Sequence, residues 1–435
     1  MGPLRRKSAS PLLGRGIFGE YSTTDNEIWS HQRALIRPSF VRAQVTDFSI
    51  FSHHVDQLIA LIARHNYEVD LQQLFFRMFI GAYDLRAHQV LDSNSEYMFG
   101  ESVGLMSENA SESATEFHQA LDYAQQGTIL RLRLGNLMFT HRDKKFRQCC
   151  RTVHAYASRF VDQALEYRSK QQQQQQQATG GSQASEKGAA AKEEGTARQK
   201  YVFLNELAKD TDDPVLLRDQ IVNMLLAARD TTAGLLAFTF FVLARRPDIW
   251  SKLRADVLDH YREPLTYEAI QEMTYLRYVL QETLRCFPPI ATNSRMAHRD
   301  TVVPCGGGPD GRSPLFVKRG SVVTYSTFVM HRRREFFGSD ADAFRPERWA
   351  PGEGLRPGWE YLPFNGGPRI CPGQKFALAE ASYTVARLLR AFEAIESRGL
   401  DPDEDPVPAD GWREQLTLSL TLRDGVLCRL IPAAT

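Results

Sequence analysis

The amino-acid sequence predicts a mainly α-helical fold with a small β component. From residue 25 to about residue 168, apolar residues recur at three- and four-residue spacing, which is typical of amphipathic helices. Short β-branched runs such as "LFV" and "SVVTYSTFVM" come later, and "LTLSLTL" alternates near the C-terminus. We therefore expect helices to form most of the core and the later runs to form a small sheet.

Composition narrows the class of protein. The chain has 435 residues and a formal net charge of +1, from 53 Lys+Arg against 52 Asp+Glu, so a nucleic-acid binder is not indicated. Its six cysteines show no repeated C-x-x-C spacing, which argues against a disulfide scaffold and a structural zinc site. We recognise no targeting or anchoring segment, and the longest apolar stretch, 235–244, has about half of the roughly 20 residues that a membrane span requires.

The helices can be placed in order along the chain. Early helical segments include "NEIWSHQRALIRPSF", "VDQLIALIARH" and "FVDQALEYR". Asp213 can cap a helix whose first turn holds Pro214, and the next proline is Pro247. Residues 215–246 can therefore run unbroken for roughly 48 Å, at about 1.5 Å per residue. A further helix is expected to end at Pro288, and another to follow the segment "PFNGGPRICPGQ".

Residues 170–200 form a candidate insertion. A glutamine homopolymer, 171–177, is followed by Gly, Ser, Ala, Lys and Glu, a composition with too few apolar groups to order a chain. We expect a disordered surface loop, with a domain linker as the alternative. Because both flanks look like parts of one helical core, we favour the loop and treat residues 1–435 as a single domain.

The segment "PFNGGPRICPGQ" matches the pattern F-x-x-G-x-R-x-C-x-G just before an amphipathic helix. The matching residues are Phe364, Gly367, Arg369, Cys371 and Gly373. Pro372 in the first helical turn, the helix dipole and Arg369 are expected to lower the pKa of the Cys371 thiol, as a thiolate ligand of haem iron requires. Thiolate ligation favours O–O cleavage and so points to oxygen activation. The alternative is an inert buried cysteine.

This loop, and much of the chain, resembles the cytochrome P-450 family. The resemblance implies the P-450 fold, with haem b between the 215–246 helix and the helix after Cys371. In the first of these helices, "AARDTT" resembles the family's oxygen-activation signature A-G-x-D-T-T, with Ala228 in place of glycine. The resemblance assigns to Thr231 a hydrogen bond that assists oxygen activation, and to Asp230 the relay of protons. The alternative is a polar stripe satisfied by a neighbouring helix.

The resemblance also assigns a structural network. Glu282 and Arg285 lie three residues apart in "QETLR", and Arg348 of "FRPERW" is their implied third member. Such a buried network is favourable only if every charge is paired. For the first two residues alone, an exposed salt bridge is the alternative.

Cations for the two haem propionates are implied at three places: an early helix, the strand after the helix that carries Glu282, and the cysteine loop. The implied residues are Trp29 with Arg33, then Arg295, then Arg369. His31 is a fourth candidate contact, with an ordinary surface position as the alternative.

Longer segments such as "VFLNELAKDTDDPVLLRDQIVNMLLAARDTTAGLLAFTFF" resemble fungal P-450s that hydroxylate n-alkanes and fatty acids. This implies a monooxygenase that inserts one oxygen atom from dioxygen into an aliphatic substrate. It also implies an NADPH-cytochrome P-450 reductase as partner and the cytosolic face of the endoplasmic reticulum membrane as location. Family members have an anchor helix and further elements before the Trp-bearing helix, so we expect this chain to be N-terminally truncated.

Two alternative functions stay open at this point. A truncated chain can be a non-catalytic haem-binding remnant. A haem-thiolate enzyme can also rearrange fatty-acid hydroperoxides, which needs neither reductase nor proton relay. The intact Asp230–Thr231 pair argues against the second alternative.

Overall fold

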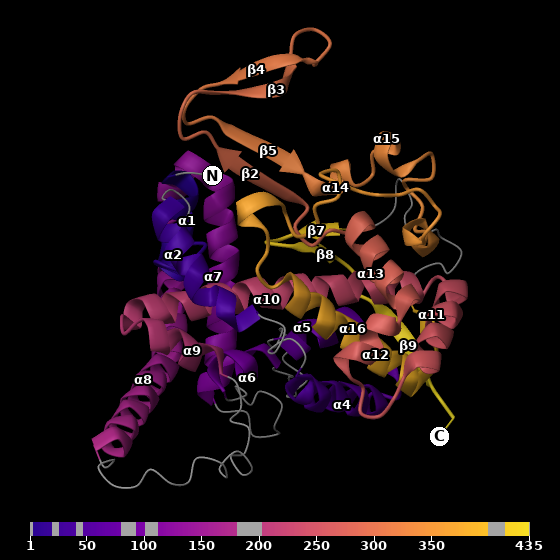
Figure 1. Cartoon of the computed structure of the whole chain (residues 1–435), viewed down its shortest axis with the longest axis horizontal. Coiled ribbons are helices and arrows are strands. Elements are labelled where there is room, and N and C mark those ends of the chain that lie inside the picture. Colours follow the sequence, from indigo (N-terminus) through magenta and orange to yellow (C-terminus); the bar gives the residue numbers. More distant parts are fainter. Residues whose placement is uncertain are drawn as a thin grey trace.

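A computed structural model shows the mainly α-helical fold with small sheets that the sequence predicts (Figure 1). It describes residues 3–19, 26–40, 47–79, 93–100, 112–180, 202–398 and 414–434. The α-helices are α1 (Pro3–Leu13), α2 (Asn26–Ile36), α4 (Ser49–Arg64), α5 (Leu71–Phe79), α6 (Ser93–Phe99), α7 (Glu112–Leu134), α8 (Lys144–Gly180), α9 (Phe203–Asp210), α10 (Pro214–Leu243), α11 (Pro247–His260), α12 (Tyr267–Glu272), α13 (Thr274–Cys286), α14 (Thr327–Met330), α15 (Arg334–Phe337) and α16 (Gln374–Ala391). The 3-10 helices are η1 (Arg37–Phe40), η2 (Gly135–Thr140), η3 (Pro346–Trp349) and η4 (Gly367–Arg369).

The strands form four small antiparallel groups. They are β1 (Glu68–Asp70), β2 (Thr292–Met296), β3 (Thr301–Gly307), β4 (Ser313–Val317), β5 (Val322–Ser326), β6 (Phe392–Ser397), β7 (Glu414–Leu416), β8 (Leu420–Leu422) and β9 (Leu427–Pro432). β2 pairs with β5, β3 with β4, and β7 with β8, while β9 lies between β1 and β6. The β3–β4 hairpin projects from the body of the molecule in Figure 1.

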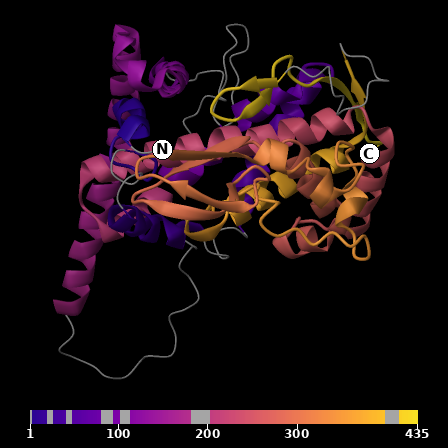
Figure 2. The ribbon, with the colours of Figure 1, turned by 90° about the horizontal axis from the view of Figure 1, so that it is seen from above.

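The long helix α10 crosses the middle of the molecule in both ribbon views (Figures 1 and 2). Its start is the predicted one: the Asp213 carboxylate accepts hydrogen bonds from the backbone N–H groups of Val215 (3.0 Å) and Leu216 (3.1 Å), and Pro214 fills the first turn. By length and composition α10 could cross a membrane, but 83% of its apolar window is buried inside the protein. We therefore describe it as the central core helix.

Several helices pack on α10 and fix what surrounds it. Phe75 of α5 lies 5.3 Å from Phe240 of α10, measured between ring centroids, and Phe287 stacks on Phe238 at 4.6 Å. α16 also packs against α10. Because α16 begins directly after the cysteine loop, this contact brings the loop and the centre of α10 into one region.

The segment after α1 is tied to the first half of α10 through backbone N–H groups. Those of Arg15, Ile17 and Phe18 donate to the side chains of α10 at 2.7, 3.1 and 2.8 Å. The acceptors, in the same order, are Asp219, Gln220 and Asn223. The polar side chains near the start of the otherwise apolar helix α10 therefore hold residues 15–18 against it.

Two parts of the fold differ from expectation. α8 continues through the glutamine tract to Gly180, so the expected disordered loop does not begin at residue 170. Glutamine is a good helix former, and lengthening an existing helix avoids the cost of nucleation. The rest of the segment lies outside the described residues. Strands β1, β6 and β9 were not expected, because β1 is very short and β6 follows α16 without a helix-breaking residue.

Candidate active site

The cysteine loop is shaped by tight backbone turns. The Cys371 N–H donates to the Phe364 carbonyl at 2.9 Å, and the chain passes through left-handed conformations at Asn365 (φ 63°) and Gly367 (φ 68°). A Cβ atom at Gly366 would lie 2.5 Å from the Trp359 ring, so any side chain there would displace that ring. The result is a loop that leaves the Cys371 side chain exposed.

The side chain of Asn365 ties this loop to the β2–β5 sheet. Its Oδ1 atom accepts hydrogen bonds from the Tyr325 hydroxyl (2.6 Å) and from the Asn293 amide (3.2 Å). Arg295 lies two residues along the same strand, is exposed, and has its guanidinium 5.8 Å from the Tyr325 ring. The sheet therefore carries Arg295 to the neighbourhood of the loop.

A second group of cations joins α2 to the same loop. The guanidinium of Arg369 lies 3.8 Å from the centre of the Trp29 ring, and that of Arg33 lies 5.5 Å from it. Arg33 also donates to the Ile370 carbonyl at 2.8 Å. His31 is exposed on the same helix and takes no part in this stack. Of the four candidates from α2 and the loop, the fold therefore brings Trp29, Arg33 and Arg369 together beside the cysteine.

The protein surroundings do not by themselves favour a Cys371 thiolate. Although Cys371 is exposed to solvent, protein atoms crowd around its sulfur and desolvate it, which raises the pKa of the thiol against the opposing effects of the Gly373 N–H and the Arg33 charge. This corrects the expected lowering. The helix begins only at Gln374, so Pro372 precedes its first turn. The charge that lowers the thiol pKa is that of Arg33, where we expected that of Arg369. A thiolate here depends on coordination to a metal ion, which deprotonates a thiol outright.

One small patch of α10 is open. From Ile221 to Leu243 every side chain is buried except Ala227, Ala228 and Thr231, which lie on one face. The Thr231 hydroxyl donates to the Ala227 carbonyl at 2.8 Å. Small side chains on this face leave room for a flat group. Together with the exposed thiol and nearby arginines, the patch fits a haem with two propionates.

Asp230, the neighbour of Thr231, points away from that face toward α7. Its carboxylate is buried, accepts a hydrogen bond from the Gln125 amide, and lies 3.6 Å from the Arg229 guanidinium. Burial raises the pKa of Asp230, and the charge of Asp122 adds to the rise, although Arg229 and Gln125 oppose it. Sequence patterns do not reveal that Asp122 and Gln125 of α7 lie beside Asp230, because α7 lies about a hundred residues away along the chain.

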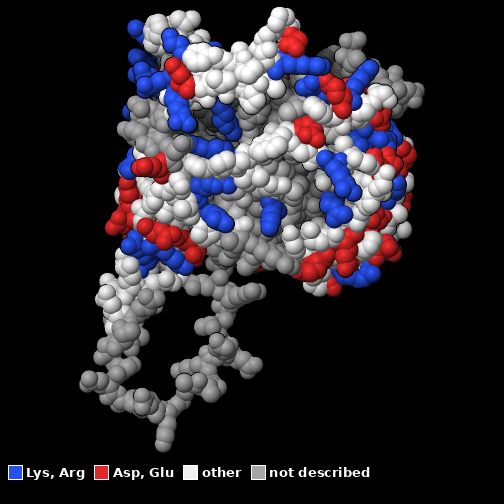
Figure 3. Space-filling model, turned by 45° about the horizontal axis from the view of Figure 1, so that its top comes forward, with Lys and Arg blue, Asp and Glu red and all other residues white. Residues whose placement is uncertain are grey.

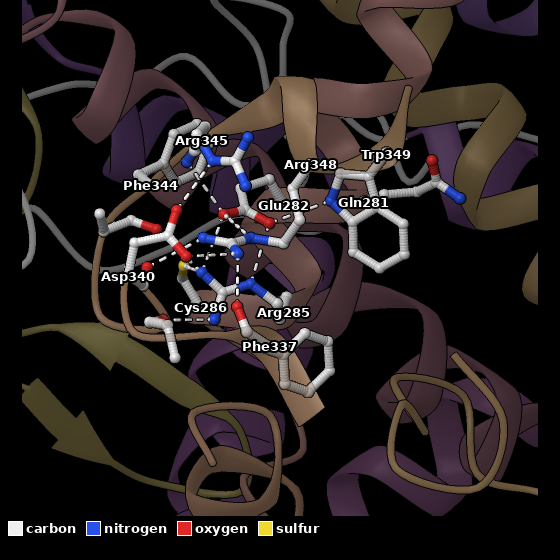
Figure 4. A network of polar contacts seen from close by, with 12 residues as sticks. Gln281, Glu282, Arg285, Cys286, Phe337, Asp340, Phe344, Arg345, Arg348 and Trp349 are labelled. Carbon is white, nitrogen blue, oxygen red and sulfur yellow. Dashed lines mark hydrogen bonds and ion pairs between the residues drawn. The ribbon is translucent and has the colours of Figure 1, made fainter. Parts of the chain in front are cut away.

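The network assigned to Glu282, Arg285 and Arg348 is present as a group of direct contacts (Figure 4). Arg285 contacts both Glu282 oxygens, at 2.8 and 2.9 Å, and Arg348 lies 3.4 Å from one of them. The Trp349 indole N–H and the backbone N–H of Arg345 also donate to this carboxylate, at 3.0 and 2.9 Å. All three charged side chains are buried. The cluster joins α13 to η3 and the segment before it.

An exposed cysteine in a glycine-rich loop before a helix, with a central helix that opens at a threonine, defines a haem-thiolate protein. The family model described as Cytochrome P450 matches residues 14–416. The chain is 40% identical to Cytochrome P450 monooxygenase himC of Aspergillus japonicus, over 97% of this chain and 68% of that protein. It is 38% identical to Cytochrome P450 52A6 of Candida tropicalis, over 97% and 75%. For Cytochrome P450 monooxygenase fsdH of Fusarium heterosporum the values are 39%, 97% and 68%.

The chain belongs to the cytochrome P450 family. It is therefore an oxidoreductase that incorporates oxygen, with haem iron held by a cysteine thiolate. Membership also implies a redox partner and a hydrophobic substrate.

Proposed function

We propose that this protein is a haem-thiolate monooxygenase that hydroxylates an alkane or a fatty acid. The observation that carries the proposal is the packing of α16, which follows Cys371, against α10, whose side chains from Ile221 to Leu243 are buried except at Ala227, Ala228 and Thr231. Haem bound at Cys371 supplies the iron at which dioxygen is activated. We take the haem to be of the b type, which the resemblance to the family implies, and the sequence has no Cys-x-x-Cys-His motif for covalent attachment of a c-type haem.

The chain's own residues divide the work of binding. Cys371 is the iron ligand, and Phe364 and Gly373 shape the loop around it. The propionates would be held by Arg33, Arg369 and Arg295, with Trp29 supporting the first two. His31 is exposed on the same helix and is our fourth candidate contact to the propionates.

Proton handling falls to Asp230 and Thr231. Asp230 is buried, with a raised pKa that suits a carboxyl group which takes up and releases a proton. Thr231 is partly exposed on the open face, and the Ala227 carbonyl fixes its hydroxyl. Asp230 takes up and releases the proton on the α7 side of α10, and Thr231 presents its hydroxyl on the open side.

The electron donor is an NADPH-cytochrome P450 reductase at the cytosolic face of the endoplasmic reticulum membrane. The resemblance to fungal alkane and fatty-acid hydroxylases supports both this donor and the aliphatic substrate. On the face shown in Figure 3, Lys and Arg side chains occupy the middle and most acidic side chains lie toward the edges. Such a distribution favours an acidic docking partner.

The spectrum of the ferrous protein with carbon monoxide tests the iron ligand. The protein should show the long-wavelength Soret band of thiolate ligation, and Cys371→Ala should lose it. Cys305→Ala is the matched control, because Cys305 is also an exposed free cysteine but lies on the projecting β3–β4 hairpin. A thiolate band in Cys371→Ala would refute the assignment.

Product analysis tests the reaction. With NADPH and reductase, the protein should convert n-alkanes or fatty acids to hydroxylated products. Conversion of fatty-acid hydroperoxides without NADPH, in place of hydroxylation, would show the rearranging enzyme instead. An intact thiolate band with neither reaction would show a non-catalytic haem protein.

A further inference from the structure

A buried cluster of charged and polar groups joins α7 to α10 behind the open face. His118, Asp122 and Gln125 follow one another at spacings of four and three, which places them on one face of α7. Asp122 lies 2.5 Å from the Arg229 guanidinium and 3.2 Å from His118 Nε2. Gln125 donates to the carboxylate of Asp230. The α7 side chains thus reach both members of the Arg229–Asp230 pair.

The charges in this cluster do not balance. Two carboxylates, Asp122 and Asp230, share one guanidinium, and Arg229 lies nearer to Asp122 (2.5 Å) than to Asp230 (3.6 Å). His118 adds no positive charge at neutral pH, because burial lowers its pKa to about 4 against the effect of Asp122. One carboxylate is left without a full counter-charge in a buried place, and a proton on Asp230 restores neutrality.

The cluster also leaves polar atoms without hydrogen bonds. Among the described residues, His118 Nδ1, Gln125 Oε1 and Arg229 Nε are buried and have no hydrogen-bond partner. Each such atom lowers stability, so groups of them tend to persist where function requires them.

We propose that Asp122 and Gln125 are positioning residues for oxygen activation: Asp122 draws the Arg229 guanidinium toward itself and leaves it at a longer distance from Asp230, and Gln125 holds the Asp230 carboxyl in place, so that Asp230 can take up and release a proton. This proposal rests on the proposed function, in which Asp230 relays protons. The proton adds to a carboxylate oxygen of Asp230 and leaves from it, so the cluster returns to its starting charge in each cycle. The charged groups that act on Asp230 are Arg229 and Asp122.

The test compares Asp122→Asn and Gln125→Leu with Asp230→Asn and with the original protein. The measurements are product and hydrogen peroxide formed per NADPH, and the pH profile of product formation, on protein whose carbon monoxide spectrum shows bound haem. Glu116→Gln is the control, because Glu116 is an exposed acid on the same helix.

The two variants should move the pH profile in opposite directions. Asp122→Asn removes a negative charge, which lowers the pKa of Asp230. The alkaline limb of the pH profile, where product formation falls as the pH rises, should therefore shift by about one unit to lower pH. Gln125→Leu removes a hydrogen bond to the ionised carboxylate, which raises that pKa, so the limb should shift to higher pH and more hydrogen peroxide should form. A residue with a merely structural role would not move the limb in either direction.

If neither Asp122→Asn nor Gln125→Leu shifts the pH profile, while Asp230→Asn forms less product per NADPH, this proposal is overturned and the proposed function still stands. Original coupling in Asp230→Asn would overturn the proton role of Asp230 itself, and the present proposal with it. If Asp122→Asn fails to bind haem, Gln125→Leu alone decides the question.

Discussion

Two buried clusters of charge lie in this protein, and they are built in opposite ways. In the cluster of Glu282, Arg285 and Arg348, each Glu282 oxygen accepts at least two hydrogen bonds, and none of the three side chains has a buried atom without a partner among the described residues. In the cluster of Asp122, Arg229 and Asp230, one counter-charge serves two carboxylates. A satisfied cluster resists change and suits a structural role, whereas an unbalanced one can take up a proton.

The largest expected effect comes from breaking the satisfied cluster. Arg285→Met leaves Glu282 buried beside a single arginine and removes donors to the His331 and Ala341 carbonyls. Loss of one partner of a buried ion pair costs about 3–5 kcal/mol, so urea unfolding should show a loss of this size and haem content should fall. Arg334→Met is the control, because Arg334 is exposed and pairs with Asp342 on the surface, and it should change stability little. Equal losses in both variants would contradict the distinction.

Acid sensitivity should appear in both regions, since one buried neutral histidine lies beside each cluster. Burial lowers the pKa of His331 from 6.5 to about 4, against opposing contributions from the Leu284 and Arg285 backbones. Its folded pKa lies below its unfolded one, so its stabilising contribution is full above about pH 6.5 and is lost as the pH falls toward about 4. That loss is about 3 kcal/mol at about 1.36 kcal/mol per pKa unit.

His331→Gln should flatten this part of the curve of unfolding free energy against pH, because glutamine can still accept the hydrogen bond from the Leu362 N–H and does not titrate. His118→Gln should remove the other part of the acid loss, as the pKa of His118 is lowered to about 4 as well. An unchanged curve for His331→Gln would show that this histidine is not buried in its neutral form.

A smaller effect should appear at the open face of α10. Thr231→Ala should keep haem and substrate binding but lower the product formed per NADPH by about tenfold, with hydrogen peroxide formed instead, since the last proton-transferring hydroxyl is gone. Thr239→Ala is matched to it. Thr239 also donates to the carbonyl four residues earlier in α10, at 2.8 Å, but is fully buried. Normal coupling in Thr231→Ala would remove the threonine from the proton route.

The smallest effect is expected for removal of residues 171–199. The described glutamines at 172–174 are exposed on the end of α8. Loop-closure cost changes slowly with length, so haem content and the thermal midpoint should stay nearly unaltered. A large loss of haem would mean that the segment packs on the core.

Local chemistry explains why part of this protein could be predicted from sequence. Asp213 and Pro214 start α10 because a cap and a first-turn proline act within a few residues. Glu282 and Arg285 meet because three residues separate them on one helix. The cysteine loop was recognisable because its glycines and Cys371 are close in the chain. The start of the glutamine-rich loop was placed wrongly, since composition alone does not show where an existing helix ends.

The sequence by itself determined the helix that forms the core, the cysteine of the glycine-rich loop, and the threonine that interrupts an apolar helix, because each depends on neighbours along the chain. Tertiary structure decided how those groups behave. Packing raises the pKa of Cys371 where the helix dipole was expected to lower it. Packing also brings Asp122 and Gln125 to Arg229 and Asp230 across about a hundred residues. Burial and long-range pairing depend on the whole fold, and no periodicity in the chain encodes them.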